Sequence, residues 1–303
     1  MRNGDRSMAA RWVALGLIAV TAAWAWSQAS AQPVFADRAG NMEVWDANFA
    51  VQRIDGERFT FRAVAKSAGA PILARWKKQG REVRAREITG TAASDASRQV
   101  SLLDAVFSGS VNVKETRPSS NRTVSSVQEL NLTAARAVFA GAQNTWNLEG
   151  GVTVTREDPG ARQTLRLNGS RAVLRLYPAN EANARPSPIR QAEMFGPVRF
   201  RSRGARFVRE GQEPGRWVPT ELVGSADRLE YDDAERQLVL TGNVDIDGSE
   251  EFLLGRVRAD RAVVTFDEQG NAVKLESEGA PGTAELRDPT SRAPRPSREG
   301  VRP

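Results

Sequence analysis

The stretch Leu238-Val-Leu-Thr-Gly-Asn-Val-Asp-Ile246 decides the fold expected for this chain. Counted from the central Gly242, every second residue is apolar: Leu238, Leu240, Val244 and Ile246. The polar residues all fall on the intervening positions. We call these two alternating sets of positions the apolar parity and the polar parity. A period of two is typical of a β-strand with one face turned away from water. The stretch therefore predicts a half-buried strand.

The same pattern recurs three times upstream, each time around a glycine. The residues of the apolar parity are Ala105, Phe107, Gly109, Val111 and Val113, then Trp146, Leu148, Gly150, Val152 and Val154, then Ala192, Met194, Gly196, Val198 and Phe200. The four glycines are 41, 46 and 46 residues apart. A period in the forties indicates a repeat architecture, in which no copy can bury its apolar face alone.

A second element accompanies each glycine strand. It consists of a small or polar residue and an arginine, followed by alternating apolar residues. The copies are Ala135-Arg-Ala-Val-Phe139, Ser170-Arg-Ala-Val-Leu-Arg-Leu176, Ala226-Asp-Arg-Leu-Glu-Tyr231 and Ala259-Asp-Arg-Ala-Val-Val-Thr-Phe266. We expect the arginine on the wet face of a strand, and polar turns such as 232–235 and 267–271 to close hairpins.

The composition excludes several kinds of chemistry. The 303 residues include no cysteine and no histidine, which removes disulfides, thiolate and imidazole metal ligands, cysteine nucleophiles and the usual general base. With 40% hydrophobic and 26% charged residues, the chain is typical of a globular protein.

The chain is basic, with 43 lysines and arginines against 37 aspartates and glutamates. Arginine binds phosphate in a bidentate fork, so a nucleic acid, a membrane surface or lipopolysaccharide phosphate could be a partner. The positive charges alternate with apolar residues instead of clustering, which favours solvated strand faces. The aromatic residues share the apolar parity, so no stacking platform for nucleic acid is expected.

The chain divides into four parts. Residues 1–31 carry basic residues, an apolar run over 12–26 and Ala29-Ser-Ala31, the pattern of a secretory signal peptide, with an uncleaved membrane anchor as the alternative. Residues 32–99 read as looser β-structure that begins the sheet. Residues 100–279 hold the repeats, with loops expected at 114–122, 178–188 and 209–219, and the proline-rich residues 280–303 are expected to form a disordered tail.

No catalytic site is expected. Carboxylate pairs occur at Glu157/Asp158, Asp232/Asp233, Asp245/Asp247 and Glu250/Glu251. All lie in turns or on the polar parity, where a carboxylate stays solvated with its ordinary pKa. We expect no cofactor and no metal ion. A hydrolase that uses Asp245 and Asp247 is the enzymatic alternative.

The segments Ala-Asp-Arg-Leu-Glu-Tyr231, Leu-Val-Leu-Thr-Gly-Asn-Val244 and Ala-Asp-Arg-Ala-Val263 resemble the OstA-like repeat of the periplasmic lipopolysaccharide-transport proteins, the family of LptA, LptC and the N-terminal domain of LptD. The match covers 226–279 most closely and 103–201 more loosely. The resemblance implies an open, twisted antiparallel β-jellyroll that holds lipid acyl chains in an apolar groove. It also implies a periplasmic location and end-to-end pairing of edge strands with other jellyroll transport proteins or further copies.

Two functions follow for the apolar face. The first is a carrier of lipopolysaccharide or a similar amphiphile, without catalysis, whose groove is lined by Val111, Val113, Trp146, Leu148, Val152, Val154, Met194, Val198, Phe200, Leu238, Leu240, Val244 and Ile246. The second is an envelope scaffold or assembly protein whose sheet closes on a packed core. The residues alone leave both open.

Overall fold

The computed structural model describes residues 32–38, 41–96, 100–118, 127–160, 162–178, 187–208, 216–250, 253–267, 272–279 and 283–286. In this part of the chain the regular structure is β, apart from two short 3-10 turns, η1 (Lys77–Gln79) and η2 (Gly141–Gln143). The expected all-β class is confirmed. The strands are β1 Phe35–Ala36, β2 Met42–Trp45, β3 Ala47–Arg53, β4 Arg58–Ala65, β5 Ile72–Trp76, β6 Arg81–Ala85, β7 Glu87–Ser94, β8 Val100–Pro118, β9 Val127–Ala140, β10 Thr145–Asp158, β11 Gln163–Leu176, β12 Ile189–Val208, β13 Arg216–Asp232, β14 Gln237–Glu250, β15 Leu253–Phe266, β16 Ala272–Glu278 and β17 Thr283–Leu286.

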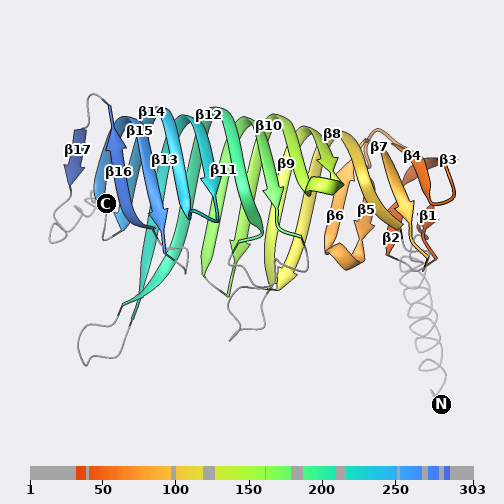
Figure 1. The fold of residues 1–303 in the computed structure, drawn as a ribbon, viewed down its shortest axis with the longest axis horizontal. Helices are drawn as coiled ribbons and strands as arrows, with labels where there is room; N and C mark the ends of the chain where they lie inside the picture. The colour runs from red at the N-terminus through yellow and green to blue at the C-terminus, as the bar shows by residue number, and fades with distance from the viewer. Residues whose placement is uncertain are drawn as a thin grey trace, which may run out of the picture.

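All strands belong to one antiparallel sheet of 17 strands. From β8 to β15 each strand pairs with the strands before and after it in the sequence. The strands therefore follow one another along the long axis of the molecule, from β1–β3 at one end to β16 and β17 at the other (Figure 1). The sheet is open, because its first and last described strands do not pair with each other.

Each long strand bends near its middle. The pairing register of β8, β10, β12 and β14 shifts at Gly109, Gly150, Gly196 and Gly242, so the sheet divides into two halves. Half-sheet I contains β3, β4, β7, β16 and residues 100–108, 136–140, 145–149, 171–176, 189–195, 228–232, 237–241 and 261–266. Half-sheet II contains β1, β2, β5, β6, β17 and residues 111–118, 127–134, 152–158, 163–169, 198–208, 216–226, 244–250 and 253–259.

The repeat glycines allow this bend. Gly150 has φ +82° and Gly242 has φ +75°, in the left-handed region that side chains with a Cβ rarely adopt. A Cβ on Gly150 would lie 2.6 Å from Cβ of Ala135, and one on Gly242 would lie 2.4 Å from Oδ2 of Asp227. Ala135 and Asp227 belong to the second recurring sequence element. The two recurring sequence elements therefore lie on neighbouring strands and contact each other at the bend.

The N-terminal strands continue the same bent sheet as separate short strands. β6 pairs with residues 112–115 of β8 in half-sheet II, and β7 pairs with residues 100–108 of β8 in half-sheet I. Only Arg86 separates β6 from β7, and only Asp46, with φ +58°, separates β2 from β3. Residues 42–94 therefore extend the bent sheet beyond β8.

The core lies between the two half-sheets. Its largest fully buried side chains include Trp76, Trp146, Phe107, Met42 and Ile72. Burying a side chain of this size contributes about 1.5–3 kcal/mol relative to leaving it in water. The arginines that follow the small residue of the second element, such as Arg136 and Arg171, are exposed on the outer face, as the pattern predicts.

Three segments differ from expectation. Residues 114–118 and 216–219, which were expected in loops, form the ends of β8 and β13, because their backbones pair with β9 and β12. Thr283–Leu286 lies in the expected tail but forms β17, which pairs with β15. The expected signal or anchor, residues 1–31, and residues 287–303 lie outside the described residues.

Candidate functional site between the half-sheets

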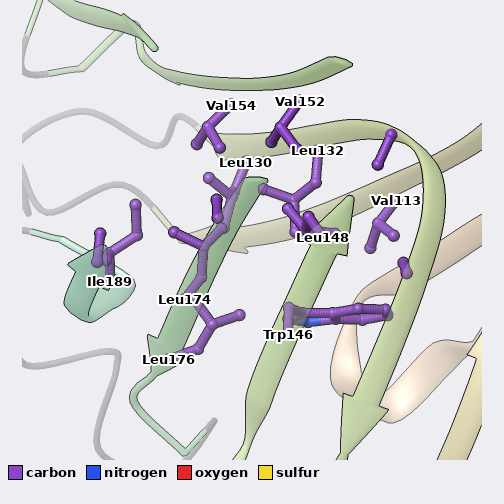
Figure 2. Close-up of a cluster of buried hydrophobic side chains, with 14 of the residues drawn as sticks. Val113, Leu130, Leu132, Trp146, Leu148, Val152, Val154, Leu174, Leu176 and Ile189 are labelled. Carbon is purple, nitrogen blue, oxygen red and sulfur yellow. The ribbon is translucent and has the colours of Figure 1, made fainter. Parts of the chain in front are cut away.

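The thirteen residues predicted to line a groove all point into the space between the half-sheets. All are buried, and Leu238, at 8% exposed, is the most accessible. Half-sheet I contributes Trp146, Leu148, Met194, Leu238 and Leu240, and half-sheet II contributes the other eight. The alternating pattern therefore identifies the inner face, and Figure 2 shows members of this face from both half-sheets gathered in one cluster.

Around Trp146 this interior is filled by side chains. The ring of Trp146 lies 4.8 Å from that of Phe139 and 5.5 Å from that of Phe107, centroid to centroid. Leu148 and Val154, on the same strand as Trp146, are fully buried. In this region the predicted groove residues pack against one another as a core.

A cavity of about 170 Å³ lies further along, with lining residues from β10 to the start of β16. Its apolar lining includes Leu165, Leu167, Leu222 and Leu229. Of the thirteen predicted residues, Phe200 and Leu238 line it. Ligand pockets usually measure about 300–1,000 Å³, so the cavity as it stands holds only a fragment of a lipid chain.

The margin of this cavity is polar. The carboxylate of Asp233 lines it and accepts hydrogen bonds from the hydroxyls of Tyr177 (2.9 Å) and Tyr231 (2.8 Å). Burial, together with the negative charge of Asp233, raises the pKa of Tyr231, so this hydroxyl stays protonated and remains a donor. Arg156 and Arg236 also line the cavity, so cationic and anionic groups meet at its margin.

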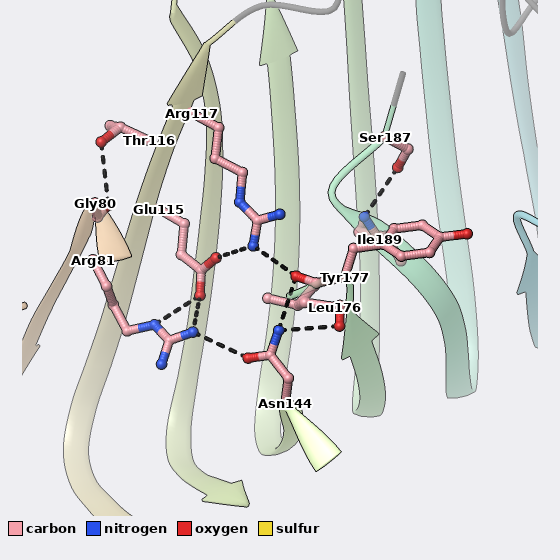
Figure 3. Close-up of polar contacts among 10 residues, drawn as sticks. All are labelled: Gly80, Arg81, Glu115, Thr116, Arg117, Asn144, Leu176, Tyr177, Ser187 and Ile189. Carbon is pink, nitrogen blue, oxygen red and sulfur yellow. Dashed lines mark hydrogen bonds and ion pairs between the residues drawn. The ribbon is translucent and has the colours of Figure 1, made fainter. Parts of the chain in front are cut away.

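A buried polar bridge joins the half-sheets next to Trp146 (Figure 3). Nε and Nη2 of Arg81 donate to Oε1 of Glu115 at 2.8 and 2.7 Å, and Nη2 of Arg117 donates to Oε2 of Glu115 at 3.1 Å. These three residues belong to half-sheet II. Across the gap, Arg81 donates to the side chain of Asn144, and Arg117 donates to the carbonyl of Tyr177, both at 3.3 Å.

The sequence analysis missed this bridge, although a signal was present. Glu115 and Arg117 continue the parity of Val111 and Val113, so a charged pair stands on the face expected to be dry. Arg81 likewise shares the parity of Val83 and Ala85, both buried. Charged residues on an apolar parity predict a buried ion pair, but the segment from residue 114 onward was interpreted as a loop.

Two carboxylates expected to be solvated are buried. Asp158 accepts a hydrogen bond from Nε2 of Gln128 at 3.3 Å, and Asp233 is held by the two tyrosines. The side-chain hydrogen bond from Arg256 lowers the pKa of Asp245, which was expected to be unshifted. Turn and strand-end positions are buried here because the half-sheets meet at those ends.

Within the described ranges, no group of three or more Asp, Glu, His or Cys side chains is placed to hold a metal ion. A search of the same ranges for a helix long and apolar enough to span a bilayer finds none.

No protein-family model matches the chain, and no curated protein matches it. Among solved structures, the chain is similar to LptH, the LptA-homologous periplasmic component of the lipopolysaccharide transport device of Pseudomonas aeruginosa. The identity is 14% over 58% of this chain and 94% of LptH, with a TM-score of 0.33.

Proposed function

We propose that this chain binds lipopolysaccharide or a similar amphiphile between its two half-sheets and passes it on without catalysis. One observation carries the proposal. An apolar interior lies between the two half-sheets of one open sheet, and part of this interior is a cavity with polar groups at its margin. Such a site suits a molecule with apolar chains and a charged head.

The energetics favour transfer of acyl chains into this interior. Covering apolar surface stabilises by about 25 cal/mol per Å², so an acyl chain gains several kcal/mol on leaving water. The cavity must widen to admit a whole chain. Widening is easiest on the side opposite the glycine bends. There the half-sheets are joined by contacts such as the hydrogen bond from the Arg117 side chain to the Tyr177 carbonyl, and not by backbone pairing of strands.

The ends of the sheet supply a route to partners. β3 and β16 are edge strands, and each carries an exposed apolar residue, Val51 and Val273, both 50% exposed. Unpaired edge strands are templates for strand addition. We propose that other jellyroll proteins, or further copies, pair there in the periplasm.

The second candidate function is a non-catalytic envelope scaffold with a closed core. The filled interior around Trp146 and the bridge from Arg81 to Glu115 favour it, because both occupy space that a continuous groove would need. In a scaffold, the edges would pair with partners while the interior stays closed.

A crosslinking experiment distinguishes the two functions. β12 offers a matched pair of phenylalanines: Phe200 lines the cavity, whereas Phe195 lies under the guanidinium of Arg171 on the outer face. Benzoylphenylalanine at each position should label lipid in living cells at 200 and not at 195. Equal labelling, with no lipid in mass spectra of the purified protein, would leave the scaffold function.

A further inference from the structure

A second cavity, of about 650 Å³, lies beside the polar bridge. Four of its lining residues are arginines, namely Arg81, Arg117, Arg175 and Arg190. Among the described residues that line it, none is acidic. The other described residues that line it are Gln79, Leu102, Phe139, Gly141, Ala142, Gln143, Asn144, Leu176 and Pro178. The volume lies within the range of small-ligand pockets, unlike that of the apolar cavity.

Two of these arginines are buried and share one counter-charge. The side chains of Arg81 and Arg117 are 4% and 10% exposed, and they share the single carboxylate of Glu115. One positive charge is therefore left over in a buried setting. Water can satisfy hydrogen bonds but does not neutralise a charge, and an unbalanced buried charge costs several kcal/mol.

The same guanidinium groups have unused donors. Nη1 of Arg81 and both Nε and Nη1 of Arg117 are buried and have no hydrogen-bond partner within the described part of the chain. Buried polar groups in native proteins nearly always have a partner, so these atoms mark a place for an acceptor. Oε1 of Gln79, also without a partner, becomes an NH₂ donor after a half-turn of its amide.

The rim adds further positive charge. Arg175 and Arg190 are exposed, and Nη1 of Arg175 is held by Oε1 of Gln191 at 2.7 Å. The charge of Arg190 also acts on Asp232, outside the cavity lining. The cavity is therefore cationic both at its rim and at its base.

From these observations we infer that this cavity is a binding site for a phosphate group, held by Arg81 and Arg117 at its base and by Arg175 and Arg190 at its rim. Guanidinium groups bind phosphate through paired, charge-assisted hydrogen bonds. The anion supplies the missing negative charge and the missing acceptors together. The inference goes beyond the proposed function, because it holds whether or not the apolar interior takes up lipid.

Calorimetric titration of the full-length protein tests the site. Inorganic phosphate and dihexanoyl phosphatidic acid, a soluble lipid with a phosphate head, are titrated separately at low ionic strength. The variant R175Q/R190Q removes the rim charges without disturbing the buried pair. The control R166Q/R199Q removes two exposed arginines elsewhere, so both variants change the net charge equally.

We expect saturable phosphate binding that weakens about tenfold or more in R175Q/R190Q and less than about twofold in the control. R117K, which keeps the charge but loses the fork, should also weaken binding. If only phosphatidic acid binds tightly, the phosphate group that the cavity takes up belongs to a lipid head group. If inorganic phosphate binds equally well, the ligand is free phosphate. Absence of saturable binding, or equal weakening in both double variants, would overturn the site. Lipid labelling at residue 200 is measured separately, so the two proposals can fail independently.

Discussion

The hydroxyl of Tyr177 donates a hydrogen bond to Oδ2 of Asp233, 56 residues further along the chain, at 2.9 Å. Tyr177 follows β11 and Asp233 follows β13, so this bond crosses the start of β12. The carbonyl of the same tyrosine accepts from Arg117 of half-sheet II. Tyr177 therefore links the ends of β11 and β13 in half-sheet I to half-sheet II. Its sequence neighbours Leu176 and Pro178 line the arginine-rich cavity, and its partner Asp233 lines the apolar cavity.

The first prediction concerns this tyrosine. Tyr177→Phe should lower the free energy of unfolding by about 1 kcal/mol, the usual net contribution of a hydrogen bond. Tyr231→Phe removes the other donor to Asp233 and should cost a similar amount. The double variant leaves a buried carboxylate with neither donor, so its cost should exceed the sum of the two. Urea unfolding measures all three, and strict additivity would mean that Asp233 finds another donor.

The second prediction concerns the strand bend. Gly150 and Gly151 both have positive φ, but only a Cβ at Gly150 would meet another atom, Cβ of Ala135 at 2.6 Å. Gly151→Ala should therefore cost about 1–2 kcal/mol from backbone strain alone. Gly150→Ala should cost more, and adding Ala135→Gly should recover the difference. Thermal unfolding gives the comparison, and equal costs for the two single variants would contradict the close approach.

The third prediction compares two glutamates that each bridge two arginines. Glu115 is buried between Arg81 and Arg117, whereas Glu221 is 38% exposed beside Arg201 and Arg203. Removing one member of a buried ion pair costs about 3–5 kcal/mol, whereas an exposed pair contributes less than about 1 kcal/mol.

Glu115→Gln should therefore destabilise the protein several times more than Glu221→Gln in chemical denaturation. Both variants lose one negative charge, so a general effect of net charge is controlled. Similar losses in the two variants would show that the interior near Arg81 is open to water.

The fourth prediction concerns acid pH. The backbone N–H of Arg58, followed by its side chain and the N–H of Glu57, lowers the pKa of Asp55 from 3.8 to about 2. A lowered folded-state pKa stabilises the fold above the unfolded value, and this stabilisation is lost as the pH falls from about 4 to about 2.

NMR titration of the Asp55 carboxyl carbon should give a midpoint near pH 2, and Asp55→Asn should remove this share of the acid dependence of stability. A midpoint near pH 4 would mean that the turn between β3 and β4 does not hold the carboxylate.

Much of the fold was predictable because it depends on local properties. The alternation of Trp146, Leu148, Val152 and Val154 around Gly150 correctly gave the inner face, since side-chain direction along a strand follows from the backbone alone. The candidate site was less predictable. Asp158 and Asp233 were expected in water, and both are buried, because the half-sheets meet where their strands end.

The sequence by itself determined a repeated antiparallel sheet with one dry face and a glycine at each bend, because strand periodicity and backbone strain are set within a few residues. Only the tertiary structure decided how the two halves of that face meet. Arg81 and Glu115 face each other on neighbouring strands of half-sheet II, but the contact of Arg81 with Asn144 depends on how closely the half-sheets approach each other. That approach also decides which part of the interior is filled and which part is a cavity, since burial depends on what lies opposite as well as on the residue itself.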